Sequence, residues 1–318
     1  MGKRANADVQ DFEYHLEDNL FRLNYELKTK TYRHAPYKRF QIFDPKHRII
    51  HKADVRDRVV HHAIYRVLAS VFEPSFIFDS YSCRIGKGTH AAVDRLEGFM
   101  RKVSKNYFGP CWALKCDIRK FFDSINHVTL MRLIEQKVKD PDTLWLLRSI
   151  GDRYEVVDNF IERERERERA HGIPIGNLTS QLFANVYMNL FDHFVKEVLH
   201  VKYYVRYTDD FIMVHENPVA LVSLLPPMRT FLKEQLILDL HPRKIELRKL
   251  DQGVDFLGYV ILHKYKNLRA KTEQRMLYRV EKDGLSRCQL YSCIGLLSHC
   301  EGYEMKQRLR QIYVEEHF

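Results

Sequence analysis

Hydrophobic and polar positions follow two periods along the chain, and the change of period marks the expected elements. Over residues 8–33, apolar side chains recur at a helical spacing opposite charged ones, which predicts an amphipathic helix. The short runs 40–43 and 48–50 are rich in β-branched and aromatic residues and flank a proline-containing turn, so a hairpin is expected. A helix should follow over residues 54–72, because a Glu-Pro pair would end it.

Strand and helix signals alternate in the rest of the chain. Residues 112–118 have the apolar character of a buried strand, and a helix should follow from about residue 126 to 139. A turn with the pattern Gly-x-Pro-x-Gly at 172–176 leads into an apolar helix that should end near residue 199. The remaining expected elements are strands at 202–206 and 211–214, a helix at 229–238, a strand at 240–247, a strand or hairpin at 254–261, and polar helices over 263–318.

The composition is that of an ordinary globular protein, with 45% apolar and 30% charged residues among 318. No apolar run approaches the length of about 18 residues that a membrane helix needs, and no apolar segment follows the first residues as in a secretory signal. Six cysteines occur without a Cys-x-x-Cys pair, which favours reduced thiols over a zinc site. We therefore expect a cytoplasmic protein without a membrane partner.

The charge balance changes this picture, because 52 basic residues outnumber 42 acidic ones and leave a net charge of +10. Such a surplus favours a polyanionic partner, although a solvated basic surface is the alternative. The Glu/Arg repeat at 162–169 is a different feature. It is a charged low-complexity run, and we interpret it as an exposed insertion that carries no chemistry.

The tip of the expected hairpin is Tyr207-Thr208-Asp209-Asp210. Two adjacent carboxylates repel each other by roughly 4 kcal/mol at about 4 Å and a dielectric constant near 20. A residue pair chosen only for the turn would be Asn-Gly or Asp-Gly. The pair therefore favours a divalent cation such as Mg²⁺, which prefers oxygen ligands, over the alternative of a solvated acidic turn.

Two further segments carry candidate chemistry. The loop at 80–90 contains Arg84 and Lys87 between glycines and opens a helix, an arrangement that suits phosphate but equally suits a structural loop. Asp117 closes a buried strand, where an aspartate is usually a cap or turn residue. It becomes a candidate metal ligand only in combination with the later pair of aspartates.

In this order, the motifs resemble those of reverse transcriptases over roughly residues 40–262. Asp117 with Phe122 matches the first palm motif, and Tyr207-Thr208-Asp209-Asp210 matches the Tyr-x-Asp-Asp box. The motifs that follow the box are matched by Arg243-Lys244 and by Phe256-Leu257-Gly258.

One segment narrows the resemblance. Where most such enzymes have Gln-Gly-x-x-x-Ser-Pro, this chain has Ile175-Gly176-Asn-Leu-Thr-Ser-Gln181. Together with the 80–90 loop, this form is similar to the reverse transcriptases of diversity-generating retroelements. The resemblance implies copying of a template-repeat RNA into cDNA with errors opposite adenines, and a small basic oligomeric accessory protein. It also implies a bacterial, archaeal or phage origin.

Other functions remain open beside this one. A normal-fidelity group II intron-like or retron reverse transcriptase is the alternative among enzymes. A non-catalytic RNA-binding protein that keeps a palm as its scaffold is the alternative from another class.

The resemblance implies an α+β fold, a right hand of fingers, palm and thumb with an antiparallel palm sheet and a helical thumb. The N-terminal helix and fingers would occupy residues 1–110, the palm 111–262 and the thumb 263–318, with 140–200 partly in the fingers. The substrates would be dNTPs, an RNA template and a DNA or RNA primer.

For the metals, the resemblance implies two Mg²⁺ ions about 3.5–4 Å apart. Their ligands would be the carboxylates of Asp117, Asp209 and Asp210 and the carbonyl of Ile118. Lys244 would protonate the leaving pyrophosphate, although an exposed strand lysine is equally compatible with its position.

The nucleotide contacts follow from the same resemblance. Lys46 and Arg48 would grip the triphosphate from the hairpin, or be exposed turn charges. Phe122 would be the steric gate under the sugar C2′, unless it is a core residue and Phe121 faces the site. The Gln that other members have at the position of Ile175 packs near the nascent base pair. The further candidates for binding template or nucleotide are Arg84, Lys87, Gly176 and Gln181.

Overall fold

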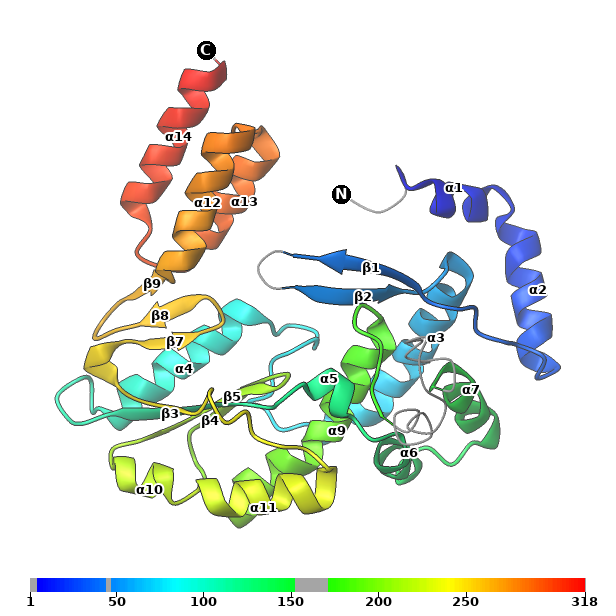
Figure 1. The fold of residues 1–318 in the computed structure, drawn as a ribbon, viewed down its shortest axis with the longest axis horizontal. Coiled ribbons are helices and arrows are strands. Elements are labelled where there is room, and N and C mark those ends of the chain that lie inside the picture. Colours follow the sequence, from blue (N-terminus) through cyan, green and yellow to red (C-terminus); the bar gives the residue numbers. More distant parts are fainter. Residues whose placement is uncertain (1–4, 44–46, 152–170, 318) are drawn as a thin grey trace, which may run out of the picture. The chain divides into compact units, whose positions relative to one another are not determined.

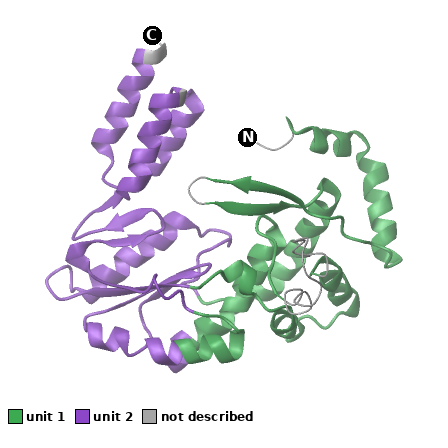
Figure 2. Ribbon diagram, in the orientation of Figure 1, with its two compact units in different colours: residues 1–77, 118–194, 229–239 green, residues 78–117, 195–228, 240–318 purple. Residues whose placement is uncertain are grey.

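The computed structural model describes residues 5–43, 47–151 and 171–317. The chain divides into two compact units, each built from three separate stretches of sequence (Figure 2). The first unit comprises 1–77, 118–194 and 229–239, and the second comprises 78–117, 195–228 and 240–318. Lys46 and the Glu/Arg repeat at 162–169 lie outside the described residues.

The first unit is mainly helical and carries one two-stranded hairpin (Figure 1). Its helix α3 packs against α9, and α6 packs against the same helix. Asn126 begins α6 as an N-cap, because its side-chain oxygen accepts a hydrogen bond from the Thr129 backbone N–H. The elements are α1 (Ala7–Tyr14), α2 (Leu16–Lys28), β1 (Lys38–Ile42), β2 (Arg48–Lys52), α3 (Val55–Phe72), a 3₁₀ turn (Glu73–Ser75), α5 (Phe121–Ser124), α6 (His127–Glu135), α7 (Pro141–Gly151) and α9 (Leu178–His193).

The hairpin and the helix after it confirm the prediction, but two helices differ from it. The helix expected over 8–33 breaks at His15 into α1 and α2. The break lets Asp8 of α1 accept hydrogen bonds from Lys52 (2.6 Å) and Arg58 (3.2 Å). The apolar helix expected to reach residue 199 ends at His193, where the chain widens into a π-helical turn, Phe194–Val198.

A buried hydrogen-bonded chain ties the N-terminal segment of this unit to α3 and α9. His34 Nδ1 donates to the Ala35 carbonyl (2.5 Å), so its Nε2 accepts from His61 Nε2 (3.0 Å). His61 Nδ1 then accepts from the Thr179 hydroxyl (2.7 Å). Burial lowers the pKa of His61 to about 3, which keeps its imidazole neutral in this arrangement.

The second unit contains an antiparallel four-stranded sheet in the order β4-β5-β3-β6 and a three-stranded sheet in the order β7-β8-β9. Helix α4 packs against β4 and β5, and its buried apolar face belongs to the same core cluster as both sheets and the C-terminal helices (Figure 1). The elements are α4 (Thr89–Val103), β3 (Trp112–Asp117), β4 (Tyr204–Tyr207), β5 (Asp210–His215), α10 (Pro218–Val222), β6 (Glu246–Lys249), a 3₁₀ turn (Leu250–Gln252), β7 (Val254–Phe256), β8 (Tyr259–Ile261), β9 (Lys266–Leu268), α12 (Ala270–Asp283), α13 (Arg287–Leu297) and α14 (Tyr303–His317). Helix α11 (Leu225–Leu236) contributes to both units.

The predicted antiparallel sheet and C-terminal helices are confirmed, with one correction that matters for the site. The strand expected over 240–247 is β6, Glu246–Lys249, so Lys244 precedes the strand and does not lie in it. Its backbone N–H donates to the carbonyl of His241 (3.1 Å), which makes this stretch a turn. The segment 254–261 is a hairpin of β7 and β8.

The pKa of His61 is lower in the folded chain than its ordinary value of 6.5. Its contribution to the free energy of unfolding is therefore fully present above pH 6.5 and is lost as the pH falls below that value. Below pH 6.5 the His61 imidazole binds a proton in the unfolded chain but stays neutral in the folded chain. We expect His61→Gln to remove a pH dependence that begins near pH 6.5, approaches about 1.4 kcal/mol per pH unit below it and ends near pH 3. Denaturant unfolding at several pH values measures it. The exposed neighbour provides the control, since His62→Gln should keep the wild-type slope.

Candidate active site

The acidic residues gather at one end of the four-stranded sheet. Tyr207 pairs with Asp210 across β4 and β5, so Thr208 and Asp209 form the two-residue tip of the hairpin. Asp117, the last residue of β3, pairs directly with Asp210, the first residue of β5. Antiparallel pairing thus brings together carboxylates that are separated by more than ninety positions in sequence.

Asp210 is a partly buried carboxylate with an unsatisfied oxygen atom. Its side chain is 22% exposed, and its Oδ1 is buried with no hydrogen-bond partner among the described residues. Its pKa is raised to about 7, mainly by burial; Lys115 lowers it, and the charges of Asp209 and Asp117 add to the increase. A buried carboxylate oxygen without a donor beside two other acids suits a divalent cation.

Two lysines offset part of the charge of this cluster. Lys244 Nζ lies 2.8 and 2.9 Å from the two carboxylate oxygens of Asp117. Lys115 Nζ lies 3.6 Å from Asp210 Oδ2 and donates to the Asp255 carbonyl (3.1 Å). Among residues 5–43, 47–151 and 171–317, no three His, Cys, Asp or Glu side chains are arranged as a metal site. Because Lys244 and Lys115 lie against the carboxylates, a cation bound there would compete with them for the same oxygens.

Sequence reasoning found Lys244 but missed Lys115. The signal was present, because side chains two positions apart on a strand share a face. Lys115 and Asp117 are so related on β3, and the register places Lys115 opposite Ile212 on β5. Ile118 follows the strand and its side chain is 1% exposed, while the metal-binding role of its carbonyl stays a prediction.

The segment that holds Ile175 and Gly176 is fastened to β2. The Ile175 carbonyl accepts from the His51 N–H (3.0 Å), and the Asn177 side chain donates to the His51 carbonyl (3.0 Å). Gly176 has a φ of +113°, and a Cβ there would lie 2.8 Å from Cγ2 of Ile50. Only glycine allows this close approach.

Side-chain exposure separates the candidates of this first unit. Phe121 is buried at 2% exposure, whereas Phe122 is half-buried and touches Phe121 edge-on at 5.4 Å between ring centres. Phe122 is thus the ring left available to a ligand. Ile175 and Gln181 are also half-buried, and Arg48 is exposed at the start of β2.

The cations of the 80–90 loop contact the loop itself. Arg84 donates to the Ser80 carbonyl (2.8 Å). Lys87 donates to the Phe78 carbonyl and lies over the rings of Phe78 (4.0 Å) and Tyr81 (4.8 Å). These contacts favour the structural interpretation of the loop, and a role in phosphate binding stays a prediction.

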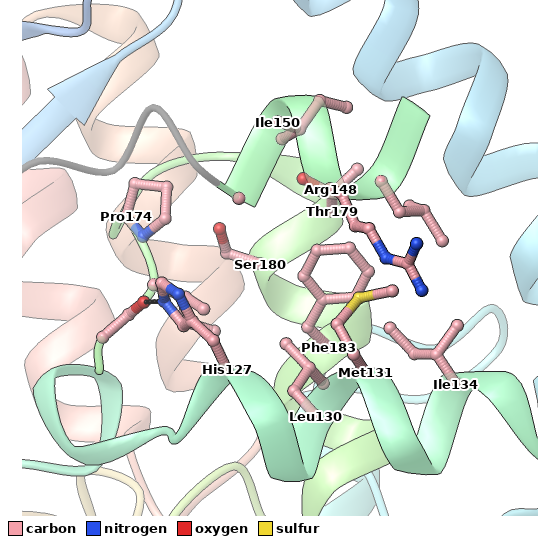
Figure 3. Close-up of a pocket in the computed structure, with 14 residues that line it drawn as sticks. His127, Leu130, Met131, Ile134, Arg148, Ile150, Pro174, Thr179, Ser180 and Phe183 are labelled. Carbon is pink, nitrogen blue, oxygen red and sulfur yellow. Dashed lines mark hydrogen bonds between the residues drawn. The ribbon is translucent and has the colours of Figure 1, made fainter. Parts of the chain in front are cut away.

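An apolar cavity lies behind the 172–181 segment in the first unit (Figure 3). It has a volume of about 70 Å³, much smaller than the several hundred cubic ångströms typical of sites for drug-sized ligands. Its lining includes Leu130, Met131, Ile134 and Phe183, and His127 donates from Nε2 to the Gly172 carbonyl (2.5 Å) at its edge. The cavity is a packing gap, too small for a nucleotide.

Comparison with known proteins places these observations in a family. The family model described as "Reverse transcriptase (RNA-dependent DNA polymerase)" matches residues 41–261. The group II intron-encoded protein LtrA of Lactococcus lactis is 27% identical over 185 residues, which cover 57% of this chain and 29% of that protein. Protein YkfC of Escherichia coli is 24% identical over 247 residues, covering 66% of this chain and 62% of that protein. The chain spans less than two thirds of the length of either relative.

Solved structures show the same fold at low identity. The apo telomerase of Candida tropicalis has a TM-score of 0.55 at 13% identity, covering 74% of this chain and 49% of that one. Telomerase of the same organism in complex with a fragment of telomeric RNA has a TM-score of 0.57 at 13% identity, covering 89% and 53%. The fold is therefore that of a right-hand polymerase, as the sequence predicts. In the part of the chain that the structure describes, no helix is long and apolar enough to cross a membrane.

The close approach at Gly176 gives a test of the fastening to β2. Gly176→Ala introduces a methyl group 2.8 Å from Ile50 at a φ that alanine rarely adopts, so we expect a loss of about 1–3 kcal/mol of unfolding free energy. Gly98→Ala in α4 is the matched control. No atom lies within 4 Å of its added Cβ, so it should be neutral or stabilising. If Gly176→Ala and wild type are equally stable in denaturant unfolding, the claim that this position requires glycine is wrong.

Proposed function

Because the chain belongs to the reverse transcriptase family, we propose that it extends a DNA or RNA primer with dNTPs on an RNA template. The observation that supports this most directly is the cross-strand pair of Asp117 and Asp210 beside Asp209. The orphaned Oδ1 of Asp210 is the atom in this cluster that most needs a cation.

The three carboxylates would hold two Mg²⁺ ions, with the carbonyl of Ile118 as a further ligand. Bound Mg²⁺ would neutralise the triphosphate charge and activate the primer 3′-hydroxyl. The lysines that hold the acids have complementary roles. Lys115 and Lys244 offset part of the charge of the metal-free cluster and would release it in exchange for a cation of higher charge.

Lys244 has a second role in this proposal. Its ammonium group already reaches the Asp117 carboxylate, at 2.8 Å, so once released it can donate a proton to the leaving pyrophosphate. Lys46 and Arg48 would contact the triphosphate, and Phe122 would exclude the ribose hydroxyl. Template and nucleotide contacts are proposed for Arg84, Lys87, Gly176 and Gln181.

We further propose that this polymerase belongs to a diversity-generating retroelement and copies a template-repeat RNA with errors opposite adenines. The support is the Ile175-Gly176 sequence and the half-buried state of Ile175, which leaves part of its side chain accessible. The hydrogen bonds to His51 hold its backbone, so Ile175 cannot move aside freely. A small basic oligomeric accessory protein would be the partner.

A second candidate is a group II intron-like or retron reverse transcriptase of normal fidelity. The similarity to a group II intron-encoded protein of Lactococcus lactis favours it. The thumb of either enzyme would comprise the helices after residue 262, the palm residues 111–262, and the fingers the residues before them.

Asp209 provides the test of the polymerase. Asp209→Asn is nearly isosteric but removes one charge from the metal site, so primer extension on RNA should fall at least about a hundredfold. Asp251→Asn alters a surface acid paired with Lys249 and should extend at the wild-type rate. Thermal unfolding confirms that both variants are folded. Near-normal extension by Asp209→Asn would refute the metal site, and RNA binding without extension by wild type would favour the scaffold.

Ile175 provides the test of fidelity. Ile offers no hydrogen bond to the nucleotide, and one hydrogen bond is worth about 0.5–1.5 kcal/mol, or up to roughly tenfold in discrimination. Ile175→Gln should therefore lower errors opposite template adenines by up to about tenfold while extension continues. Ile237→Gln changes an exposed residue of the same unit and should leave the error spectrum unchanged. The measurement is sequencing of cDNA that each variant makes from one template. Equal error rates opposite adenines in Ile175→Gln and wild type would show that Ile175 does not set the fidelity.

A further inference from the structure

The residue before the paired aspartates has an unusual backbone. Thr208 has a φ of +58°, in the left-handed region that β-branched residues rarely adopt. Such a conformation persists only when the surrounding structure determines it, and it is common at functional sites. The contacts that hold Thr208 therefore matter for the two residues that follow.

Two hydrogen bonds hold Thr208, one at its carbonyl and one at its side chain. Arg206 Nη1 donates to the Thr208 carbonyl (2.9 Å). The Thr208 hydroxyl donates to Oγ of Ser82 (2.7 Å), a residue 126 positions away in sequence. Rotation of the peptide group after Thr208, or of the Thr208 side chain, would therefore break a hydrogen bond.

Arg206 is completely buried, at 0% exposure. Its Nη2 donates to Oγ of Ser80 (3.2 Å), so one guanidinium group spans the turn and the 79–82 segment. The backbones are joined as well, because the Arg206 N–H donates to the Asp79 carbonyl (3.0 Å) and the Tyr81 N–H donates to the Arg206 carbonyl (2.9 Å). Residues 79–81 thus run parallel beside β4.

The 79–82 segment is itself anchored to a helix. The Asp79 carboxylate accepts from Nε of Arg95 (2.7 Å) on α4, which packs against β4 and β5. A buried guanidinium is costly unless its donors are satisfied, so an arginine here needs a reason beyond packing. The planar fork explains why arginine serves and lysine does not, since one ammonium nitrogen cannot reach the two acceptors in the same way.

We propose that Arg206, Ser80 and Ser82 form a brace that sets the distance between the carboxylates of Asp209 and Asp210. Asp210 is fixed by its pairing with Asp117, whereas Asp209 sits in the turn directly after Thr208. The backbone angles of Thr208 therefore decide where the Asp209 carboxylate lies relative to Asp210. Arg206, Ser80 and Ser82 are positioning residues, and their role rests on the proposed metal-dependent activity.

Ser82→Ala removes one contact of the brace without altering an acid. We expect kcat for primer extension to fall by up to about tenfold, the ordinary value of one hydrogen bond, with the KM for dNTP unchanged. The Mg²⁺ concentration for half-maximal activity should rise. A mere loss of folded protein would lower the apparent kcat without moving that concentration. Ser223→Ala is the matched control, because among the described residues the Ser223 hydroxyl donates only to the Ala220 carbonyl, within its own turn.

A measurement without metal or substrate accompanies the kinetics. Hydrogen exchange followed by mass spectrometry on the metal-free protein should show faster exchange of amides at 206–211 in Ser82→Ala than in wild type or Ser223→Ala. Arg206→Lys should show the same increase, because its single nitrogen loses one of the two acceptors. Unchanged exchange in both variants would overturn the brace.

Relief of the strained conformation gives the decisive comparison. Asn adopts the left-handed region more readily than a β-branched residue. Thr208→Asn, added to Ser82→Ala, should therefore return the kcat and the Mg²⁺ requirement to their wild-type values. A double variant no better than Ser82→Ala would overturn the proposal. The outcome is separable from the proposed function. Loss of extension in Asp209→Asn together with full activity of Ser82→Ala would leave the metal site standing and remove the brace.

Discussion

Crowding of like charges at one end of an antiparallel sheet is the constraint on which the second unit depends. The register of β3 and β5 forces Asp117 and Asp210 to be neighbours, and the hairpin turn adds Asp209. Burial of the Asp210 carboxylate is the main cause that raises its pKa to about 7, and the charges of Asp209 and Asp117 raise the pKa as well. The fold can keep such a cluster only by surrounding it with cations.

The surrounding lysines show how that is done in the absence of metal. Lys244 bonds both oxygens of Asp117, and Lys115 lies between Asp210 and the carbonyl of Asp255. The Asp255 carboxylate in turn accepts from Arg269, directly before α12. The cluster is thus part of a network of alternating charges within one unit, and a bound divalent cation would change several of its pairs at once.

In the first unit, the main constraint is the position of the 175–179 segment relative to β2 and α3. Gly176 lies so close to Ile50 that no side chain fits, and two hydrogen bonds to His51 close the same contact. Two turns into α3, His61 accepts from Thr179 at the start of α9. The 175–179 segment is consequently fixed at both ends by buried or backbone contacts, while the side chain of Ile175 stays half-buried.

Local chemistry in the sequence was sufficient to determine the hairpins, the acidic turn and most helices, because strand alternation, proline and capping residues act within a few positions. It also determined the set of acids. Pairing between distant segments decided the rest. The Phe121-Phe122 pair needed the packing of the core to show which ring is buried, and Lys244 needed the register of β6 to show that it lies in a turn. Ser82 and Thr208 meet only because a parallel bridge joins Ser80 to Arg206, and no periodicity within either segment encodes that contact.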